Sequence, residues 1–485
     1  MAARPGRTRL VVVGGDAAGM AGASQALQQA AARGRDLEVV AFERGSATSY
    51  SACGIPYWVG GVVGSREELV ARTPEEHRRR GVDLRMRTEV VGVDLAARTV
   101  AWRRTDDGRD GSGSGPREGV EGFDELLLAT GAVPRRPPAP GFDAGPEAGV
   151  HGVQTLDDGS ALLADLDGSS GHRVERVVVV GGGYIGLEVA EACVVRGLHV
   201  TVVQRGDTPL GTVDDDMGEL IAQAVRGEGV HLLTGEEVCG LELGPAAQGG
   251  RVRAVHTASG RELPCDLVVL GLGVEPSIEL AREAGVPLGE SGAVAVDVGQ
   301  RTRAEGVWAA GDCTEVRHRV SGRGVHVPLG THANKQGRVA GINLGGGYAT
   351  FPGVVGTAIT KVCRVEIGRT GLSTQEADQA GFRVVTAAVD STTTAGYMPG
   401  AEPVRVKLVA DEGSGRLLGG QVVGRSGAGK RVDALAVCVW NAMTVEEVLG
   451  LDLAYAPPFA PVWDPVLIAA RKAAQAVEAA CQRPA

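Results

Sequence analysis

The sequence predicts an α/β fold in which two parallel βαβ units are followed by a separate α+β domain. Two short apolar segments, residues 10–13 and 177–180, each run directly into glycines and then into a helical pattern. This is typical of a buried parallel strand that leads into a helix. After about residue 348 the pattern changes to short alternating segments typical of antiparallel strands. A length of 485 residues leaves room for two to four domains.

The first unit consists of a strand at residues 10–13, a helix at 20–32 and a strand at 37–42. Its loop, residues 14–19 (Gly-Gly-Asp-Ala-Ala-Gly), lacks the middle glycine of a G-x-G-x-x-G pattern, because an aspartate stands there. The small residues still allow a pyrophosphate to reach the N-terminus of the helix. Glu43, at the end of the second strand, is placed to bind a ribose 2′-hydroxyl. Alone, such a turn also occurs as plain structure.

The second unit fits the dinucleotide-binding pattern completely. Gly181, Gly183 and Gly186 follow the strand at residues 177–180, a helix runs to residue 196, and the next strand covers 199–203. Gln204 takes the ribose-binding position and Arg205 follows it. A carboxylate there would repel a 2′-phosphate, whereas glutamine and arginine accept one. The pair favours NADPH, with NADH possible; the alternative is that Arg205 is simply a solvated charge.

Further segments complete the predicted organisation. Residues 103–119 are polar and rich in glycine and serine, which predicts an exposed loop or hairpin tip. Buried strands that end in glycine are expected at 126–131, 267–273 and 307–312. The last part is expected to contain strands at 354–359, 366–370, 383–388, 404–409 and 417–423 and helices at 432–443 and 465–480. The predicted domains are 1–155 with 271–347, then 156–270, then 348–485.

Composition excludes several classes of protein. The net charge is −10 and there is no basic stripe, which argues against nucleic acid as a partner. The apolar run near the N-terminus is four residues long and no later run reaches 18, so the sequence predicts a cytoplasmic protein without a membrane span. The eight cysteines have the spacing of neither a zinc site nor a disulfide scaffold. We expect no metal site and mostly buried free thiols.

Two dinucleotide sites in one chain imply electron transfer between a mobile nicotinamide and a resident flavin. The segments Ala129-Thr130-Gly131 and Gly311-Asp312 resemble the FAD-contacting elements of the pyridine nucleotide–disulfide oxidoreductases, in the same order and spacing. This resemblance covers almost the whole chain. It implies a glutathione reductase-like fold with two Rossmann-like domains for FAD and NAD(P)H, a C-terminal dimerisation domain, and a homodimer.

Residues 49–57 (Ser-Tyr-Ser-Ala-Cys-Gly-Ile-Pro-Tyr) narrow the resemblance. Glutathione reductase-like members carry C-x-x-x-x-C here, but Trp58 occupies the second position, so an internal dithiol–disulfide cycle is excluded. The S-x-x-x-C-G pattern is similar to the single-cysteine branch, which contains coenzyme A-disulfide reductases, NADH oxidases, NADH peroxidases and persulfide reductases. A lone cysteine is usually structural, but this context predicts that Cys53 is redox-active.

Two further features favour the coenzyme A-disulfide reductases within that branch. Oxidases and peroxidases usually place a histidine in the first glycine-rich loop, and this loop has none. Coenzyme A-disulfide reductases carry tyrosines in Tyr-x-Pro-Gly-Ala and Tyr-x-Pro-Pro elements, matched by Tyr397 and Tyr455. The resemblance implies that these tyrosines reach the cysteine across a dimer interface. The alternative is that they are half-buried core residues.

The coenzyme A contacts carry over only partly. Ser49, Gln25, Asn334 and Arg338 match residues that bind coenzyme A in the family. The expected Asn, Arg and Lys are instead Ala52, Gln28 and Gly81, although the basic run at residues 78–80 could substitute. Another small thiol therefore stays open as the substrate. No rhodanese segment follows before residue 485, which weakens the persulfide alternative.

The sequence therefore predicts an FAD-dependent NAD(P)H:disulfide oxidoreductase that reduces a small disulfide such as coenzyme A disulfide. We expect Cys53 to form a mixed disulfide, its thiol pKa lowered by a helix that starts at residues 54–56, with Tyr397 and Tyr455 as proton donors. An O2-reducing NAD(P)H oxidase, a persulfide or polysulfide reductase, and a redox-sensing flavoprotein are the alternatives. The predicted cofactor-binding residues are Gly14, Asp16, Ala17, Ala18, Gly19, Glu43, Arg44, Ser51, Val90, Ala129, Thr130, Gly131, Gly181, Gly183, Tyr184, Ile185, Gly186, Glu188, Gln204, Arg205, Gly273, Gly311, Asp312, Pro328 and Leu329.

Overall fold

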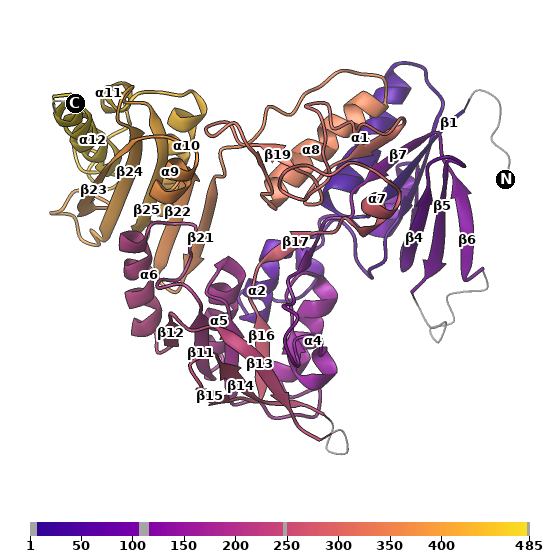
Figure 1. Ribbon diagram of the computed structural model, residues 1–485, viewed down its shortest axis with the longest axis horizontal. Coiled ribbons are helices and arrows are strands. Elements are labelled where there is room, and N and C mark those ends of the chain that lie inside the picture. Colours follow the sequence, from indigo (N-terminus) through magenta and orange to yellow (C-terminus); the bar gives the residue numbers. More distant parts are fainter. Residues whose placement is uncertain (1–6, 106–115, 246–249, 483–485) are drawn as a thin grey trace.

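The computed structural model describes residues 7–105, 116–245 and 250–482. Its three main sheets form three lobes, with the N-terminus in the first and the C-terminus in the third (Figure 1). The first sheet is parallel throughout, in the order β18-β7-β1-β2-β3. Its strands are β1 (Thr8–Val13), β2 (Leu37–Phe42), β3 (Val82–Arg85), β7 (Glu125–Leu128) and β18 (Val307–Ala309).

The residues of β1 alternate between two cores. Leu10 and Val12 pack towards α1 (Ala17–Ala32) and α8 (Gly330–Leu344). Val11 and Val13 pack towards an antiparallel sheet and the short helix α7 (Glu279–Glu283). Both faces of the strand are buried from Leu10 to Val13, which explains why these four residues are all apolar. The antiparallel strands are β4 (Thr88–Asp94), β5 (Thr99–Arg104) and β6 (Glu118–Gly122).

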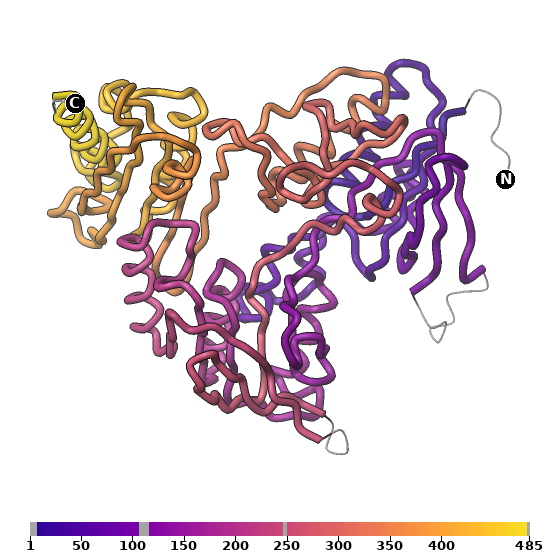
Figure 2. Tube along the Cα trace, viewed as in Figure 1, coloured from indigo at the N-terminus to yellow at the C-terminus, as the bar shows by residue number. Residues whose placement is uncertain are grey.

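Helices α1 and α8 approach each other at glycines. A Cβ atom on Gly337 would lie 2.2 Å from the carbonyl oxygen of Ala18, and one on Gly341 would lie 2.3 Å from that of Gly22. Only glycine fits such a backbone contact. The chain thus returns, after the whole second lobe, to cover the first sheet beside α1 (Figure 2).

The second lobe repeats this plan, so the predicted duplication of the fold is confirmed. Its parallel sheet has the order β12-β11-β10-β16-β9, and β10 again alternates between a helical face and an antiparallel β-sheet. The elements are β9 (Val150–His151), α4 (Leu156–Leu166), β10 (Arg176–Val180), α5 (Tyr184–Val195), β11 (His199–Gln204), α6 (Asp215–Gly227), β12 (His231–Thr234), β13 (Val238–Leu243), β14 (Val252–Thr257), β15 (Glu262–Pro264) and β16 (Leu267–Leu270).

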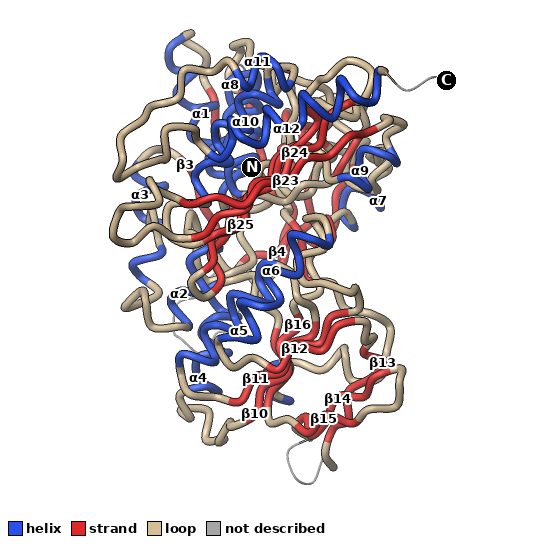
Figure 3. Tube along the Cα trace, turned by 90° about the vertical axis from the view of Figure 1, so that its left-hand side faces the viewer, coloured by secondary structure: helices blue, strands red, loops and turns tan. Residues whose placement is uncertain are grey.

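The third lobe is an antiparallel sheet in the order β21-β22-β25-β24-β23, with helices packed against it (Figure 3). The predicted strand at 354–359 is wrong, because Val354 pairs instead with His318 of the preceding segment and β21 begins only at Ala358. The elements are β21 (Ala358–Val362), β22 (Val365–Gly371), α9 (Thr374–Gln379), β23 (Val384–Thr392), β24 (Pro403–Asp411), β25 (Leu417–Gly424), α10 (Val432–Trp440), α11 (Val445–Leu449) and α12 (Pro465–Cys481).

Shorter elements connect the lobes. They are α2 (Ile55–Val59), α3 (Pro74–Arg79), β8 (Ala132–Pro134), β17 (Val274–Pro276), β19 (Val316–Arg317) and β20 (Gly324–Val325). The loop predicted at 103–119 lies largely outside the described residues; β5 ends at Arg104 and β6 begins at Glu118. The domain boundaries stay a prediction. Over the described ranges, no helix is both long and apolar enough to cross a bilayer.

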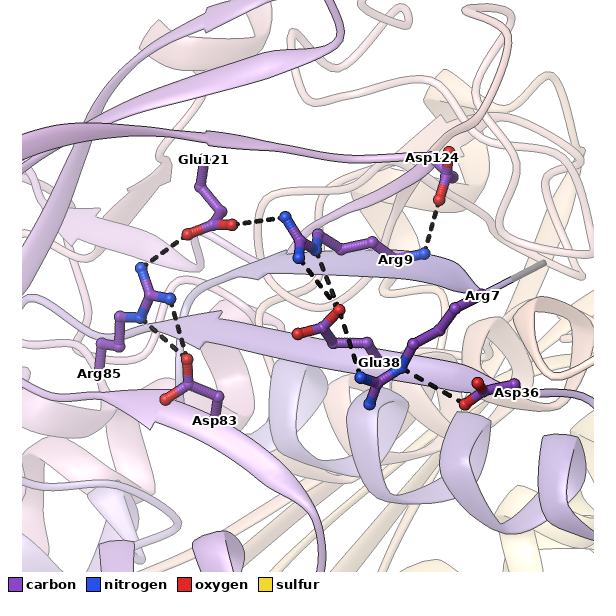
Figure 4. A network of polar contacts seen from close by, with 8 residues as sticks. All are labelled: Arg7, Arg9, Asp36, Glu38, Asp83, Arg85, Glu121 and Asp124. Carbon is purple, nitrogen blue, oxygen red and sulfur yellow. Dashed lines mark hydrogen bonds and ion pairs between the residues drawn. The ribbon is translucent and has the colours of Figure 1, made fainter. Parts of the chain in front are cut away.

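A network of ion pairs joins the antiparallel sheet to the first sheet (Figure 4). Glu121 of β6 lies 2.9 Å from Arg9 of β1 and 2.9 Å from Arg85 of β3. Arg9 also contacts Glu38 at 3.1 Å, and Arg85 contacts Asp83 at 2.9 Å. Because Glu121 is shared and only 16% exposed, its two charge-assisted contacts hold the sheets together more firmly than separate surface pairs would.

Candidate functional site

The first glycine-rich loop is shaped by backbone contacts. Gly14 has a φ of +109°, and a Cβ atom on it would lie 2.0 Å from the carbonyl oxygen of Ala129. A Cβ on Gly19 would lie 1.9 Å from the Gly14 oxygen. Asp16 is the N-cap of α1 but makes no side-chain capping hydrogen bond. The N–H groups of the first turn, at Ala17 and Ala18, therefore suit a bound phosphate.

Glu43 is held beside this loop by two backbone donors. Its carboxylate accepts hydrogen bonds from the N–H groups of Gly15 at 2.7 Å and Gly45 at 2.6 Å. Burial raises the pKa of Glu43, and these two hydrogen bonds act in the opposite direction. An oriented carboxylate at the end of β2 fits the predicted ribose contact.

The second loop has the same local geometry. Gly181 has a φ of +104°, a Cβ on Gly186 would lie 2.0 Å from the Gly181 oxygen, and Gln204 Oε1 accepts from the Gly182 N–H at 2.9 Å. A Cβ on Gly183 would meet only one carbonyl oxygen, at 3.7 Å, so open space lies above it. The Gln204 carbonyl is used by the loop, which leaves its NH2 group available to a ligand. The neighbouring Arg205 is exposed.

Asp16 takes the place in the first loop that Gly183 takes in the second. Its carboxylate accepts from the Tyr50 N–H at 3.3 Å, which ties the loop to the cysteine-bearing segment. Desolvation, opposed by that hydrogen bond and reinforced by the charges of Glu43 and Asp312, raises the pKa of Asp16 to about 6. Desolvation alone raises the pKa of Asp312 to about 6. Both carboxyl groups, of Asp16 and Asp312, therefore have a pKa closer to neutral than an ordinary aspartate has.

The turn that carries Asp312 is held by hydrogen bonds to a buried glutamine side chain. Buried Gln336 accepts from the Gly311 N–H at 2.8 Å and donates to the Thr314 hydroxyl at 3.1 Å. On the neighbouring strand end, the Thr130 hydroxyl donates to the Ser277 carbonyl at 2.6 Å. The predicted FAD elements from β1, β7 and β18 therefore meet at one edge of the first sheet.

Cys53 lies in a 3-10 turn, Ala52–Gly54, immediately before α2. A Cβ on Gly54 would lie 2.3 Å from a methyl of Leu69, so a larger residue after the cysteine would have to displace that side chain. Trp58, at the position of the missing second cysteine, is 8% exposed and packs with Ile55 in the core of the second lobe. The cysteine is therefore placed where the first and second lobes meet, and the residue itself is exposed.

The expected lowering of the Cys53 pKa is wrong for the folded chain. Desolvation by the surrounding protein raises the pKa of the thiol although the residue is exposed, and the carboxylates of Glu188 and Asp312 raise it further. α2 does begin at Ile55, as expected, but it is only five residues long. Stabilisation of a thiolate must come from groups that approach the site.

Glu188 connects the cysteine to the third lobe. It lies on α5, and its carboxylate accepts a hydrogen bond of 2.5 Å from the Thr360 hydroxyl on β21. Burial raises the pKa of Glu188 despite that bond. Burial raises the pKa of Tyr57, and the charge of Glu188 raises it further. Sequence reasoning did not find Thr360, because no local pattern links it to α5.

Four predicted substrate-binding residues lie on two surfaces. Gln25 of α1 contacts Gly341 of α8, and α8 carries the exposed Asn334 and Arg338. The Ser49 hydroxyl is 2.9 Å from His77 Nε2 on α3. Buried His77 was not predicted; burial lowers its pKa, so it is neutral at pH 7.

Tyr397 and Tyr455 lie beside each other on the third lobe. Both are exposed, at 75% and 47%, which excludes the core-residue alternative. Desolvation, then the charge of Tyr397 and a hydrogen bond with it, raise the pKa of Tyr455. Phe459, Val462 and Trp463 are exposed around them, at 76%, 69% and 48%. A group of large apolar side chains left exposed on one lobe is typical of an interface with another protein.

The remaining predicted cofactor residues are distributed around the two loops. Tyr184 begins α5, and its hydroxyl is 3.2 Å from that of Thr212. Gly131 and Gly273 both have positive φ and open space at the Cβ position, and Pro328 and Leu329 lead directly into α8. Arg44 and Ser51 are exposed, Val90 is buried in β4, and Ile185 lies in the first turn of α5.

Comparison with protein families gives two matches. Residues 8–337 match the family described as pyridine nucleotide-disulphide oxidoreductase, and residues 357–465 match the dimerisation domain of the same family. The second match covers the lobe that carries the exposed tyrosines.

Curated relatives match along nearly the full length. An NAD(P)H sulfur oxidoreductase (CoA-dependent) of Pyrococcus abyssi is 39% identical, with 95% of this chain and 97% of the relative covered. An NADH oxidase of Methanocaldococcus jannaschii is 33% identical, with 96% and 98% covered. A coenzyme A disulfide reductase of Staphylococcus haemolyticus is 27% identical, with 93% and 96% covered.

Solved structures agree in fold. An NAD-dependent persulfide reductase from A. fulgidus has a TM-score of 0.88 and 35% identity, covering 96% of this chain and 83% of that one. An engineered water-forming NADPH oxidase, bound to NADPH, has a TM-score of 0.87 and 26% identity, covering 98% and 100%. Its five substitutions include an aspartate to alanine and, at the next position, an alanine to arginine.

Proposed function

Because the chain belongs to the pyridine nucleotide-disulphide oxidoreductases, a family that depends on FAD and a pyridine nucleotide, we propose that it reduces a coenzyme A-type disulfide through Cys53. The observation that carries the proposal is the place of this thiol. It lies where the first and second lobes meet, and buried Trp58 leaves no second sulfur at the position of a dithiol partner. A single thiol of this kind forms a mixed disulfide with its substrate.

Each of the two glycine-rich loops is proposed to bind one cofactor. The Gly14–Gly19 loop, Glu43 and Asp312 would hold FAD, which accepts hydride from the nicotinamide and returns the electron pair to sulfur when bound. The Gly181–Gly186 loop and Gln204 would hold the nicotinamide nucleotide. Overall, one NAD(P)H and one proton convert one disulfide into two thiols, and the role of Cys53 is to attack the disulfide and release the first thiol.

The tyrosines complete the site in a homodimer. Tyr397 and Tyr455 are exposed within an apolar surface on the dimerisation domain, which a second copy of this chain would cover. From the partner, their hydroxyls would donate hydrogen bonds to the sulfur of Cys53 or to the departing thiol. This supplies the thiolate stabilisation that the chain's own carboxylates oppose.

The substrate would lie along the two surfaces that carry the predicted residues. Arg338 and Asn334 on α8 and Gln25 on α1 offer a cation and amides, the chemistry that binds the phosphates of coenzyme A. Ser49 adds a hydroxyl at the start of the cysteine-bearing segment. Relatives named for coenzyme A support this assignment.

The proposal also includes the boundaries of the domains and the cellular location of the enzyme. We place the FAD-binding domain at 1–155 and 271–347, the NAD(P)H-binding domain at 156–270 and the dimerisation domain at 348–485. We also place the enzyme in the cytoplasm, since none of its eight cysteines forms a disulfide in the described chain and its cofactor and thiol products belong to a reducing compartment.

The experiment that tests the proposal is anaerobic consumption of NADPH or NADH with coenzyme A disulfide. We expect turnover of about 1–100 per second with two thiols formed per nucleotide oxidised. Cystine and oxidised glutathione serve as matched disulfides that lack the phosphates. Turnover with cystine equal to that with coenzyme A disulfide would overturn the substrate assignment.

Persulfide reduction is the second candidate, favoured by the names of the relatives from Pyrococcus and A. fulgidus. The same assay with polysulfide distinguishes it by the release of sulfide. O2 reduction is distinguished by nucleotide consumption that starts only when air is admitted.

We further propose a preference for NADPH, based on Gln204 and Arg205. Replacing both, Gln204→Glu with Arg205→Ala, is expected to raise KM for NADPH about 100-fold and to lower that for NADH, because the new carboxylate repels a 2′-phosphate and accepts a ribose hydroxyl. The measurement is kcat/KM for both nucleotides, with Arg226→Ala on α6 as the control for loss of an exposed arginine. An unchanged ratio would contradict the assignment. In the engineered NADPH oxidase, the loss of an aspartate and gain of an adjacent arginine parallel this pair.

A further inference from the structure

Two loops without regular structure carry the exposed tyrosines. Tyr397 lies between β23 and β24, and Tyr455 lies between α11 and α12. One backbone hydrogen bond joins the loops directly, from the Ala395 N–H to the Pro457 carbonyl at 3.0 Å. Loops of this kind carry little order of their own, so the relative position of the two hydroxyls depends on what holds their backbones.

One guanidinium group, that of Arg431, contacts both loops. Its Nη2 donates to the Thr393 carbonyl at 2.6 Å, four residues before Tyr397, and to the Phe459 carbonyl at 3.1 Å, four residues after Tyr455. Its Nη1 donates to the carbonyl of Gly427. The side chain is only 11% exposed, and its bond to Thr393 is partly buried, whereas the bonds to Phe459 and Gly427 lie nearer the surface.

The fourth contact fixes the direction of the guanidinium. Nε of Arg431 lies 3.2 Å from Asp464 Oδ2, and this carboxylate is itself only 14% exposed. The other oxygen of Asp464 accepts from the Val466 N–H at 2.9 Å and so caps α12. The end of the Tyr455 loop, the start of α12 and the Tyr397 loop are therefore joined through one planar group.

We propose that Arg431 is a positioning residue for the reaction, which sets Tyr397 and Tyr455 at a fixed separation so that both hydroxyls reach one sulfur. The inference rests on the proposed role of the tyrosines in disulfide reduction. Lysine cannot replace it, because an ammonium group lacks the planar set of donors that serves three carbonyls and a carboxylate together.

The test is a cycle of variants on the holoenzyme. Arg431→Lys is expected to lower kcat/KM for coenzyme A disulfide about 10–100-fold, the size of a misplaced proton donor. In the background Tyr397→Phe with Tyr455→Phe, the same replacement is expected to change kcat/KM less than about 2-fold, because the groups that it positions are gone. Reduction of the flavin by NAD(P)H, measured by stopped flow, is expected to stay unchanged in every variant.

Arg425→Lys is the matched control. Arg425 also contacts the Tyr397 loop, through Glu402 at 3.8 Å, but it is 42% exposed and touches no residue of the Tyr455 loop. We expect it to retain full activity. Should Arg431→Lys not fold, Asp464→Asn removes the charged partner while an amide oxygen can still cap α12, and it is expected to show the same dependence on the tyrosines.

The outcomes separate the inference from the function on which it rests. Full activity of Arg431→Lys, or an equal loss with and without the tyrosines, overturns the positioning role and indicates a purely structural one. Full activity of the double phenylalanine variant overturns the proposed role of the tyrosines themselves, whatever Arg431→Lys does.

Discussion

Cys53→Ser is expected to abolish disulfide turnover, by about 1,000-fold or more, while reduction of FAD by NAD(P)H continues. A serine hydroxyl cannot form the mixed disulfide, so the step after flavin reduction has no acceptor. The residue is exposed and contributes little to the core, so the free energy of unfolding should change by less than about 0.5 kcal/mol. Anaerobic stopped flow separates the two steps, since flavin bleaching persists and thiol release stops.

Another cysteine provides the control for this experiment. Cys239 is exposed on β13. Cys239→Ser is expected to retain full turnover, because its thiol lies in the antiparallel sheet of the second lobe. If Cys53→Ser keeps more than about a tenth of the wild-type activity, or if Cys239→Ser loses it, another group carries the electrons.

Asp16→Asn is expected to stabilise the FAD-free protein above about pH 6 by about 1–3 kcal/mol. The carboxyl of Asp16 has its folded pKa raised to about 6 from 3.8, so the folded state binds the extra proton between these values. The contribution of Asp16 to the free energy of unfolding therefore falls as the pH rises through this window and stays low above it. Asparagine is neutral throughout and its Oδ1 can still accept from the Tyr50 N–H. The variant therefore does not lose the stability that ionisation of Asp16 costs the wild type.

Urea unfolding at several pH values between about 4 and 8 measures this effect. Asp143→Asn, at an exposed aspartate, is the matched control and is expected to leave the curve unchanged. A variant whose stability runs parallel to that of the wild type throughout this range would contradict the raised pKa of Asp16.

The sequence by itself determined the parts of the protein that depend on local pattern. Apolar runs ending in glycine identified β1 and β10, because the four residues at the end of each strand are buried on both faces of the sheet. The spacing of Gly14 with Gly19, and of Gly181 with Gly186, identified both loops, because a Cβ at these places would collide with backbone. The prediction that Cys53 is the redox thiol came from a different kind of signal, the resemblance of residues 49–57 to the single-cysteine branch of the family.

The tertiary structure alone decided the environment of these residues. The pKa of Cys53 depends on Glu188 and Asp312, which come from different lobes and are far apart in the sequence, so no local pattern could show that their charges oppose a thiolate. The first strand of the third lobe begins later than its pattern predicts, because Val354 pairs outside that lobe. Arg431 is one arginine among many in the sequence. Only the fold, by bringing two loop carbonyls and a carboxylate within reach of one planar group, gives it a place near the tyrosines.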